Sequence, residues 1–211
     1  IIGIDNLDNY YSVEFKKLRI KVLKKNKNFL FKKIDLKDRR KLIGFLRKKK
    51  IDIIHNFAAQ AGVRYSVSDP DKYFSNNIIS FLNILEVVEM LKPKYFFFAS
   101  SSSIYGDQDK RKYPLKENVD VNPKNIYGFS KFVNEISAKT FSNLWKTKFI
   151  GLRFFTVFGE WGRPDMLLFK ILNCSLNAKV FYLNNNGKHF RDFTYIKDVV
   201  KILIKLQHLK L

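Results

Sequence analysis

The sequence has very little cysteine and no long hydrophobic segment. Its single cysteine, Cys174, excludes a disulfide bond within the chain and is typical of proteins in a reducing compartment, so we expect a cytoplasmic location. No apolar stretch approaches the ~20 residues that a membrane-spanning helix needs. We therefore expect no membrane partner.

Acidic residues are also scarce. There are 19 of them against 40 lysines and arginines, which gives a formal net charge of +21. Such a charge is typical of proteins that bind nucleic acid. However, the lysines are spread along the chain, and the densest runs, at residues 16–25 and 47–50, fall on expected helix faces and ends, where cations favour the C-terminal dipole. We expect no nucleic-acid partner, and an anionic substrate is a simpler use for a few of these charges.

Strand and helix patterns alternate along most of the chain. This order predicts an α/β fold, a Rossmann-like doubly wound parallel sheet with helices on both faces. Near-continuous apolar segments such as 95–98 are typical of strands buried on both sides. The expected strands are 1–4, 29–34, 51–57, 95–100 and 149–158, and the expected helices are 13–25, 37–49, 73–91 and 127–145.

The pattern changes after residue 158. We expect helices at 165–177 and 195–207, and strands at 180–183 and 189–193 on either side of an Asn-rich turn. Residues 1–158 are therefore predicted as the sheet domain, and residues 159–211 as the start of a small substrate-binding part. The chain has 211 residues, opens on a strand-like segment and closes on a helical one, so we expect a fragment of a longer protein, truncated at both ends.

Polar or small residues follow several of the predicted strands. Ligands bind at the carboxyl edge of an open α/β sheet, and an acidic residue at the end of a strand can accept a hydrogen bond from a ribose hydroxyl. The alternative for each acid is a helix N-cap, and both readings stay open. The residues at this edge are Asp5, Asp35, Ala58, Ala59, Gln60, Ser101, Phe155 and Thr156.

Two short segments carry acid/base chemistry. Tyr127 and Lys131 are spaced i, i+4 and share one helix face, and a serine run at 100–103 ends the apolar strand before them. A free phenol titrates near ~10, and a nearby cation favours its charged form. The pair could therefore supply a phenolate close to neutral pH. The alternative is a capped core strand followed by an ordinary amphipathic helix.

Taken together, six segments resemble the extended short-chain dehydrogenase/reductases, the NAD-dependent nucleotide-sugar epimerase/dehydratase family, and within it the chain is most similar to UDP-glucuronate 4-epimerases. The resemblance covers essentially the whole chain. A Y-x-x-x-K alone is a weak signal, whereas the ordered set is specific. The segments are 55–66, 100–106, 127–131, 151–159, 161–166 and 191–195.

The resemblance implies a role for each candidate residue. Tyr127 would be the base on the sugar 4-hydroxyl, Lys131 would hold the nicotinamide ribose and lower the tyrosine pKa, and Ser101 would bind the 4-oxygen. The cofactor would be NAD, with no metal. Asp5 and Asn6 would hold its adenosine ribose and Asp35 and Leu36 would flank adenine. Its other contacts would be Ala58, Ala59, Gln60 and Asn76 or Asn77. The substrate would meet Ser102, Ser103, Arg64, Thr156, Arg163 and Arg191.

The serine run separates related reactions. Dehydratases resembling this chain have Asp-Glu where it has Ser102-Ser103, and these acids eliminate water after the oxidation. A serine hydroxyl cannot transfer the protons of this elimination near neutral pH. Oxidation at C4 should therefore be followed only by hydride return, which is epimerisation. Arg163 favours a carboxylate-bearing sugar, because a guanidinium can grip a carboxylate bidentately. The alternative for Arg163 is a surface turn.

We therefore expect an NAD-dependent 4-epimerase of UDP-glucuronate that works through a 4-keto sugar. The alternatives are the same reaction on UDP-glucose or UDP-galactose, and an inactive fragment or scaffold. A homodimer through the helices at 73–91 and 127–145 is implied. The glycine-rich phosphate loop of the family is absent from the 211 residues, so the pyrophosphate lacks its helix N-terminus and we expect the fragment alone to be inactive.

Overall fold

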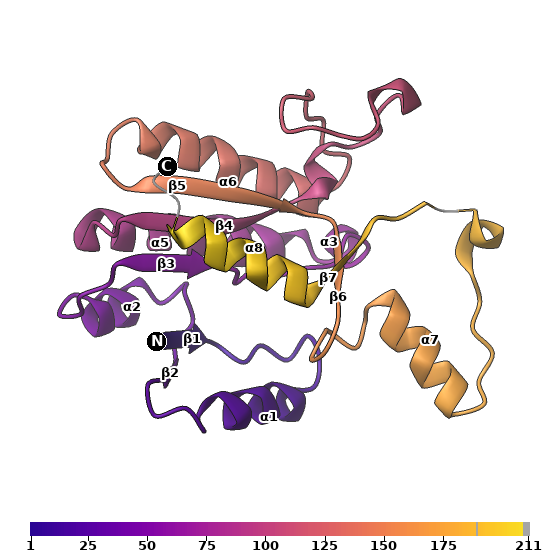
Figure 1. The fold of residues 1–211 in the computed structure, drawn as a ribbon, viewed down its shortest axis with the longest axis horizontal. Helices are drawn as coiled ribbons and strands as arrows, with labels where there is room; N and C mark the ends of the chain where they lie inside the picture. Colours follow the sequence, from indigo (N-terminus) through magenta and orange to yellow (C-terminus); the bar gives the residue numbers. More distant parts are fainter. Residues whose placement is uncertain (189, 209–211) are drawn as a thin grey trace. The chain divides into compact units, whose positions relative to one another are not determined.

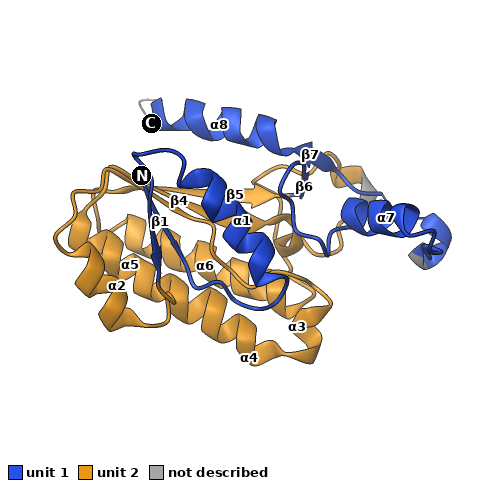
Figure 2. Cartoon of the chain, turned by 90° about the horizontal axis from the view of Figure 1, so that it is seen from below, with its two compact units in different colours: residues 1–33, 155–210 blue, residues 34–154, 211 orange. Residues whose placement is uncertain are grey.

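The computed structural model describes residues 1–188 and 190–208 (Figure 1). These fall into two compact units, one made of residues 34–154 and one of residues 1–33 together with the described residues from 155 onward (Figure 2). Parallel strands and helices make up both units. The predicted α/β fold class is therefore confirmed.

The unit of residues 34–154 is built on a three-stranded parallel sheet in the order β3-β4-β5 (Figure 1). Its central strand β4 carries the aromatic run Tyr95–Phe98, in which no side chain is more than 3% exposed. Burial on both faces explains why this strand is apolar without alternation. The strands are β3 (Ile53–Asn56), β4 (Tyr95–Ser101) and β5 (Lys148–Phe154).

Two long helices cover one face of this sheet. Alternate residues of β4 point to the same face, and there Phe81 of α5 packs its ring on Phe96 and Phe98, while Ser100 bonds to Glu135 of α6. Asn125 caps α6 by accepting from the Gly128 amide at 2.8 Å. The helices of this unit are α2 (Arg39–Leu46), α3 (Tyr65–Ser68), α4 (Pro70–Tyr73), α5 (Ser80–Leu91) and α6 (Ile126–Ser142).

The predicted helix at 73–91 is interrupted. Residues Phe74–Ile79 form a π-helix between α4 and α5. Among the described residues, Pro70–Leu91 is the one helical stretch long and apolar enough to cross a membrane by length and composition. Phe81, Leu85 and Val88 of this stretch are buried in the core of the unit.

The other unit holds two separate pairs of parallel strands. β1 pairs with β2, and β6 pairs with β7. Ser12 caps α1 by accepting from the Phe15 amide at 3.2 Å. The elements are β1 (Ile2–Asp5), α1 (Val13–Leu23), β2 (Leu30–Lys33), β6 (Thr156–Phe158), α7 (Leu167–Leu176), β7 (Phe193–Tyr195) and α8 (Ile196–His208).

Three strand predictions need correction. The strand predicted at 149–158 is two strands, β5 and β6, which pair with β4 and β7 respectively. The strand predicted at 180–183 is irregular chain in which Val180 and Tyr182 are exposed, because apolar content alone creates no partner strand. The strand predicted at 189–193 is placed instead at β7, and residue 189 lies outside the described residues.

The parallel sheet expected for residues 1–158, without its first strand, is found in the described residues as parallel strands in three separate sheets. The predicted domain boundary at 158/159 stays a prediction.

Candidate active site

The serine turn, residues 101–103, begins where β4 ends. Ser101 is buried, and its Oγ accepts a hydrogen bond from the Ser103 amide at 3.1 Å. Ser102 and Ser103 are half-buried and start a 3-10 turn. Gly106, at φ +63°, follows this turn, and a Cβ there would lie 1.9 Å from the Asn122 carbonyl oxygen. The turn is therefore held closely against the chain that leads into α6.

The first turn of α6 packs directly on the serine turn. A Cβ on Gly128 would lie 2.5 Å from the Ser103 carbonyl oxygen, so only glycine allows this approach. Tyr127, the residue before it, is half-buried, and its ring meets the buried Tyr73 ring edge-on at 6.2 Å. Ser101 and Tyr127 are thus placed at the same, carboxyl edge of the sheet.

Lys131 lies one turn further along α6. It is 3% exposed, and its Nζ donates to the Ala99 carbonyl oxygen at 2.8 Å and lies 6.0 Å from the centroid of the Tyr127 ring. Burial lowers the pKa of Lys131 to about 8, because a charged ammonium loses its water there. The lysine is therefore still charged at neutral pH and places a cation beside the phenol.

A buried amide joins the end of β3 to α6. The Asn77 side chain accepts from the Gln60 amide at 2.7 Å and donates to the Gln60 carbonyl at 3.0 Å and to Ser130 Oγ at 2.9 Å. Ser130 in turn donates to the Tyr127 carbonyl at 2.8 Å. Of the two alternatives, Asn77 is thus the residue built into this network, while Asn76 is half-buried.

The remaining predicted residues of this unit are exposed or half-buried. Ala58 and Ala59 are exposed after β3, and Arg64 is exposed at the start of α3. Asp35 accepts from the Lys37 amide at 2.9 Å, and the Leu36 carbonyl accepts from an Asn83 side chain. Asp38, not Asp35, caps α2, which removes the N-cap reading for Asp35.

In the other unit, Asp5 is the last residue of β1 and Asn6 follows it. Asp5 accepts from the Leu7 amide at 2.6 Å and Asn6 from the Asp8 amide at 2.9 Å, so both form local turns. Ser12 is the cap of α1, which removes the N-cap reading for Asp5 as well. The Asp5 residue is exposed at the strand end.

Arg163 already has a carboxylate beside it. Its Nε lies 3.5 Å from Asp165 Oδ1, and its Nη2 lies 3.2 Å from the Met166 sulfur. Tyr10 donates to Asp165 at 3.2 Å. Thr156 opens β6 in the same unit, and further along the chain Arg191 is exposed, with its Nη1 donating to the preceding carbonyl.

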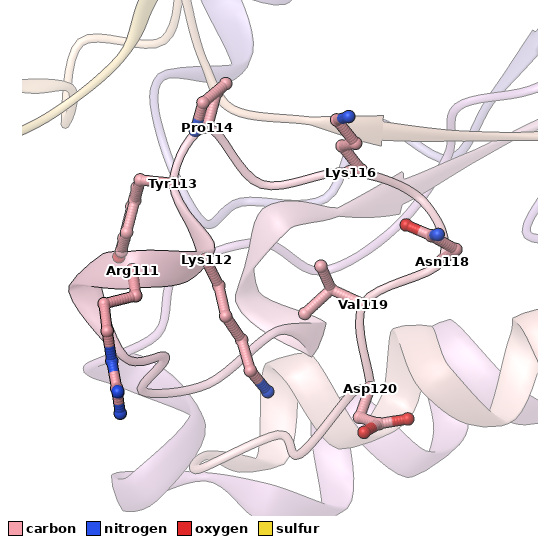
Figure 3. A pocket seen from close by; sticks show the side chains of 8 residues that line it. All are labelled: Arg111, Lys112, Tyr113, Pro114, Lys116, Asn118, Val119 and Asp120. Carbon is pink, nitrogen blue, oxygen red and sulfur yellow. The ribbon is translucent and has the colours of Figure 1, made fainter.

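One open hollow lies on the loop that follows the serine turn (Figure 3). It has a volume of about 490 Å³, and none of the predicted site residues lines it. Three of its lining residues, Arg111, Lys112 and Lys116, are basic and exposed. We do not assign the chemistry to this hollow.

Sequence reasoning missed the polar residues that hold the site in place. Ser130 is buried, and Glu135 lies on α6 one turn after Lys131. The spacing of Tyr127, Lys131 and Glu135, at i, i+4 and i+8, was a signal, since it puts all three on one helix face. The arrangement can take a proton from a bound hydroxyl, with Tyr127 as acceptor and Lys131 stabilising the phenolate.

A family model described as the NAD dependent epimerase/dehydratase family matches residues 1–209 of the chain. Protein CapI of Staphylococcus aureus is 40% identical over 98% of the chain, and a probable UDP-glucuronate 4-epimerase of Rhizobium meliloti is 36% identical over 99% of it. The chain spans 61% of the length of each of these two relatives.

Solved structures of nucleotide-sugar 4-epimerases are also similar to this chain. UDP-glucuronic acid 4-epimerase from Bacillus cereus, in complex with UDP-glucuronic acid and NAD, superposes with a TM-score of 0.90 at 29% identity, over 100% of this chain and 65% of that one. UDP-glucose 4-epimerase from Thermotoga maritima, with UDP-glucose, superposes at 0.87 and 26% identity, over 98% of this chain and 65% of that one.

Proposed function

The chain belongs to the NAD dependent epimerase/dehydratase family, and on this premise we propose that the whole protein interconverts UDP-glucuronate and UDP-galacturonate at C4. The observation that carries the proposal is the buried Lys131 beside Tyr127, on a helix that packs against the serine turn. The similarity to the Bacillus cereus enzyme, which binds UDP-glucuronic acid and NAD, supports this substrate.

The residues at the strand ends fit NAD. The Asp5 carboxylate is at the surface at the end of β1 and caps no helix, as a ribose-binding acid requires, and the exposed alanines after β3 leave backbone open to a ligand. When bound, NAD supplies the acceptor and donor of a hydride at the sugar C4. We propose that the residues that would hold it are Asp5, Asn6, Asp35, Leu36, Ala58, Ala59, Gln60, Asn76 and Lys131.

Tyr127 takes the proton of the sugar 4-hydroxyl as C4 is oxidised, and returns it when the keto group is reduced. Lys131 keeps the phenolate accessible near neutral pH, and Ser101 orients the 4-oxygen through its hydroxyl. Ser102 and Ser103 line the same turn and offer no carboxylate, so no group in this turn removes a proton from C5 to eliminate water. The 4-keto sugar is therefore reduced again, which makes the net reaction an epimerisation.

We propose that Arg163 reads the uronate carboxylate, with Arg64 as the second candidate, Thr156 nearby and Arg191 on the diphosphate. Arg163 is half-buried, and a charge-assisted hydrogen bond to a carboxylate is strong in such a position. Its guanidinium also has N–H donors besides those that face Asp165 and Met166. The Asp165 contact is also the specific observation that favours the second candidate function. An arginine already paired with a carboxylate is compatible with a neutral UDP-hexose such as UDP-glucose or UDP-galactose.

We further propose a cytoplasmic homodimer, supplying precursors for polysaccharide synthesis. Large apolar side chains are exposed along α5, α6 and the π-helix, and the rings of Phe74 and Phe129 lie 6.0 Å apart. An exposed apolar strip on two neighbouring helices is typical of a protein interface. The other exposed members are Ile79, Leu82 and Ile136.

The experiment is to incubate the whole protein with NAD and either UDP-glucuronate or UDP-glucose and to identify the products by NMR. Formation of UDP-galacturonate with the higher kcat/KM supports the proposal. Preference for UDP-glucose assigns the protein to the second candidate function. No change in either sugar, with the protein folded and NAD bound, contradicts both.

A further inference from the structure

A bidentate ion pair joins α6 to the sheet below it. Arg153 on β5 donates to the Glu135 carboxylate through Nε at 3.0 Å and through Nη2 at 2.9 Å, and Ser100 Oγ donates to the same carboxylate at 2.5 Å. The two charged side chains are only 19% and 18% exposed. Glu135 therefore connects the helix that carries Tyr127 to the last residues of both β4 and β5.

Arg153 also reaches the loop between the serine turn and α6. Its Nη1 donates to the Glu117 carbonyl at 2.9 Å, and its guanidinium lies 5.0 Å from the centroid of the buried Tyr105 ring. Hydrogen bonding to Glu135 raises the pKa of Arg153, so its guanidinium stays charged at every ordinary pH. One guanidinium thus holds the helix, the strand and the loop that surround the serine turn.

We propose that Glu135 and Arg153 are positioning residues for the hydride-transfer step. This inference rests on the proposed function. Ser100 is the neighbour of Ser101, and Glu135 shares the helix face of Tyr127 and Lys131. The pair fixes the register of α6 on β4 and so the distance between the Ser101 hydroxyl and the Tyr127 phenol. A fork–fork pair fixes orientation as well as distance, which a single hydrogen bond does not.

A second ion pair in the same unit provides a matched control. Arg39 of α2 donates through Nε and Nη2 to Glu86 of α5, so it has the same bidentate geometry. Its side chains are 59% and 34% exposed, and it joins two helices other than α6. Glu86→Gln therefore tests the loss of such a pair without a change near the site.

The test compares Glu135→Gln, Arg153→Lys, the double variant Glu135→Met/Arg153→Met, and Glu86→Gln with the unchanged whole protein. The double variant is included because replacing both partners of a buried pair by apolar residues often preserves stability, whereas removing one leaves a buried charge. Steady-state kinetics and single-turnover absorbance at 340 nm are measured well below the melting temperature of each variant.

We expect kcat and the single-turnover hydride-transfer rate to fall about 10- to 100-fold in Glu135→Gln and in the double variant, because small misplacements of reacting groups cost such factors. KM for the UDP-sugar should change less than about threefold, since binding is not the affected step. Glu86→Gln should have the same kcat and the same hydride-transfer rate as the unchanged protein. A double variant that is folded and has unchanged kcat and single-turnover rate overturns the inference.

The outcome is separable from the proposed function. If the unchanged protein forms no NADH signal and no product with either sugar, the proposed function fails. If the unchanged protein is active and the Met/Met variant equals it, the function stands and the ion pair contributes stability alone.

Discussion

The buried ammonium of Lys131 makes folding stability depend on pH. Its pKa is lowered from 10.5 to about 8 by burial, so the folded state disfavours the charged form. Between these two values the unfolded chain binds more protons than the folded one, and the free energy of unfolding must rise with pH. Below pH 8 the lysine is charged in both states and the folded state carries the full desolvation cost.

We predict that the free energy of unfolding gains about 3 kcal/mol from this lysine between pH 8 and 10.5, because a difference of one proton contributes about 1.4 kcal/mol for each pH unit. The contribution is isolated by urea unfolding of the whole protein and of Lys131→Met at pH 7, 8.5 and 10. The free energy of unfolding of the unchanged protein should increase relative to that of Lys131→Met as the pH rises. A difference that is flat, or that falls with pH, contradicts the buried ammonium.

Arg163 is predicted to set the preference for a uronate. A carboxylate held by charge-assisted hydrogen bonds contributes roughly 1.5–3 kcal/mol, so Arg163→Ala should weaken UDP-glucuronate by about 10-fold or more and leave UDP-glucose little changed. The measurement is kcat/KM for both sugars, with Arg40→Ala, an exposed arginine of α2, as the control. If the uronate preference survives in Arg163→Ala, another residue reads the carboxylate, and Arg64 is the next candidate.

The sequence makes Tyr127 and Lys131 candidates because they are one helical turn apart, and Ser101 because it ends a strand; their roles stay a prediction. It did not choose between Asn76 and Asn77. A π-helix places an extra residue in one turn and so shifts which side chain faces inward. A period of 3.6 residues cannot predict that shift. Glu135, on α6, was overlooked because its partner Arg153 lies on another element, the strand β5.

Helix α6 meets the serine turn through a glycine, and this contact is testable. We predict that Gly128→Ala destabilises the protein by about 1–3 kcal/mol, because its Cβ would lie 2.5 Å from the Ser103 carbonyl oxygen and force the two elements apart. Gly44→Ala, inside α2 with no atom within 4 Å of the new Cβ, should be neutral or stabilising by up to about 1 kcal/mol.

Chemical denaturation and steady-state kinetics of both variants check this prediction. Gly128→Ala should lose kcat as well as stability, since Tyr127 is the preceding residue of the helix. Equal stability of the two alanine variants would mean that α6 does not approach the turn so closely.

The type and order of most elements could be predicted from the sequence, because apolar periodicity and turn residues are local. The split of the segment 149–158 into β5 and β6 could not, since both halves are apolar and only their partners differ. The same holds for the segment at 180–183. Strand content is decided by a partner strand elsewhere in the chain, which a local pattern does not contain.

For the protein as a whole, the family predicted from six separated segments is confirmed by the family match over residues 1–209. The described strands form three separate sheets, because strand pairing depends on long-range partners that a local pattern does not contain. Ordered motifs thus identify a family even where local patterns do not predict which strands pair.

The exposed apolar strip predicts dimerisation. We expect the whole protein to sediment as a dimer, and Phe129→Glu/Ile136→Glu to shift it to monomer, because two charges would lie within the apolar contact of the partner helices. Leu176→Glu on α7, an exposed apolar residue outside the strip, is the control. A monomeric unchanged protein at micromolar concentration contradicts the prediction.

The most direct test of the central claim is the fate of the hydrogen at C4. UDP-glucuronate deuterated at C4 is converted by the whole protein, and the product is analysed by mass spectrometry and NMR. We predict UDP-galacturonate that retains the deuterium, because the hydride leaves and returns within one site. In Tyr127→Phe we predict that turnover falls by a factor of about 10² or more, while NAD binding is unchanged. Loss of the deuterium to solvent, or near-normal turnover without the Tyr127 hydroxyl, would contradict the account.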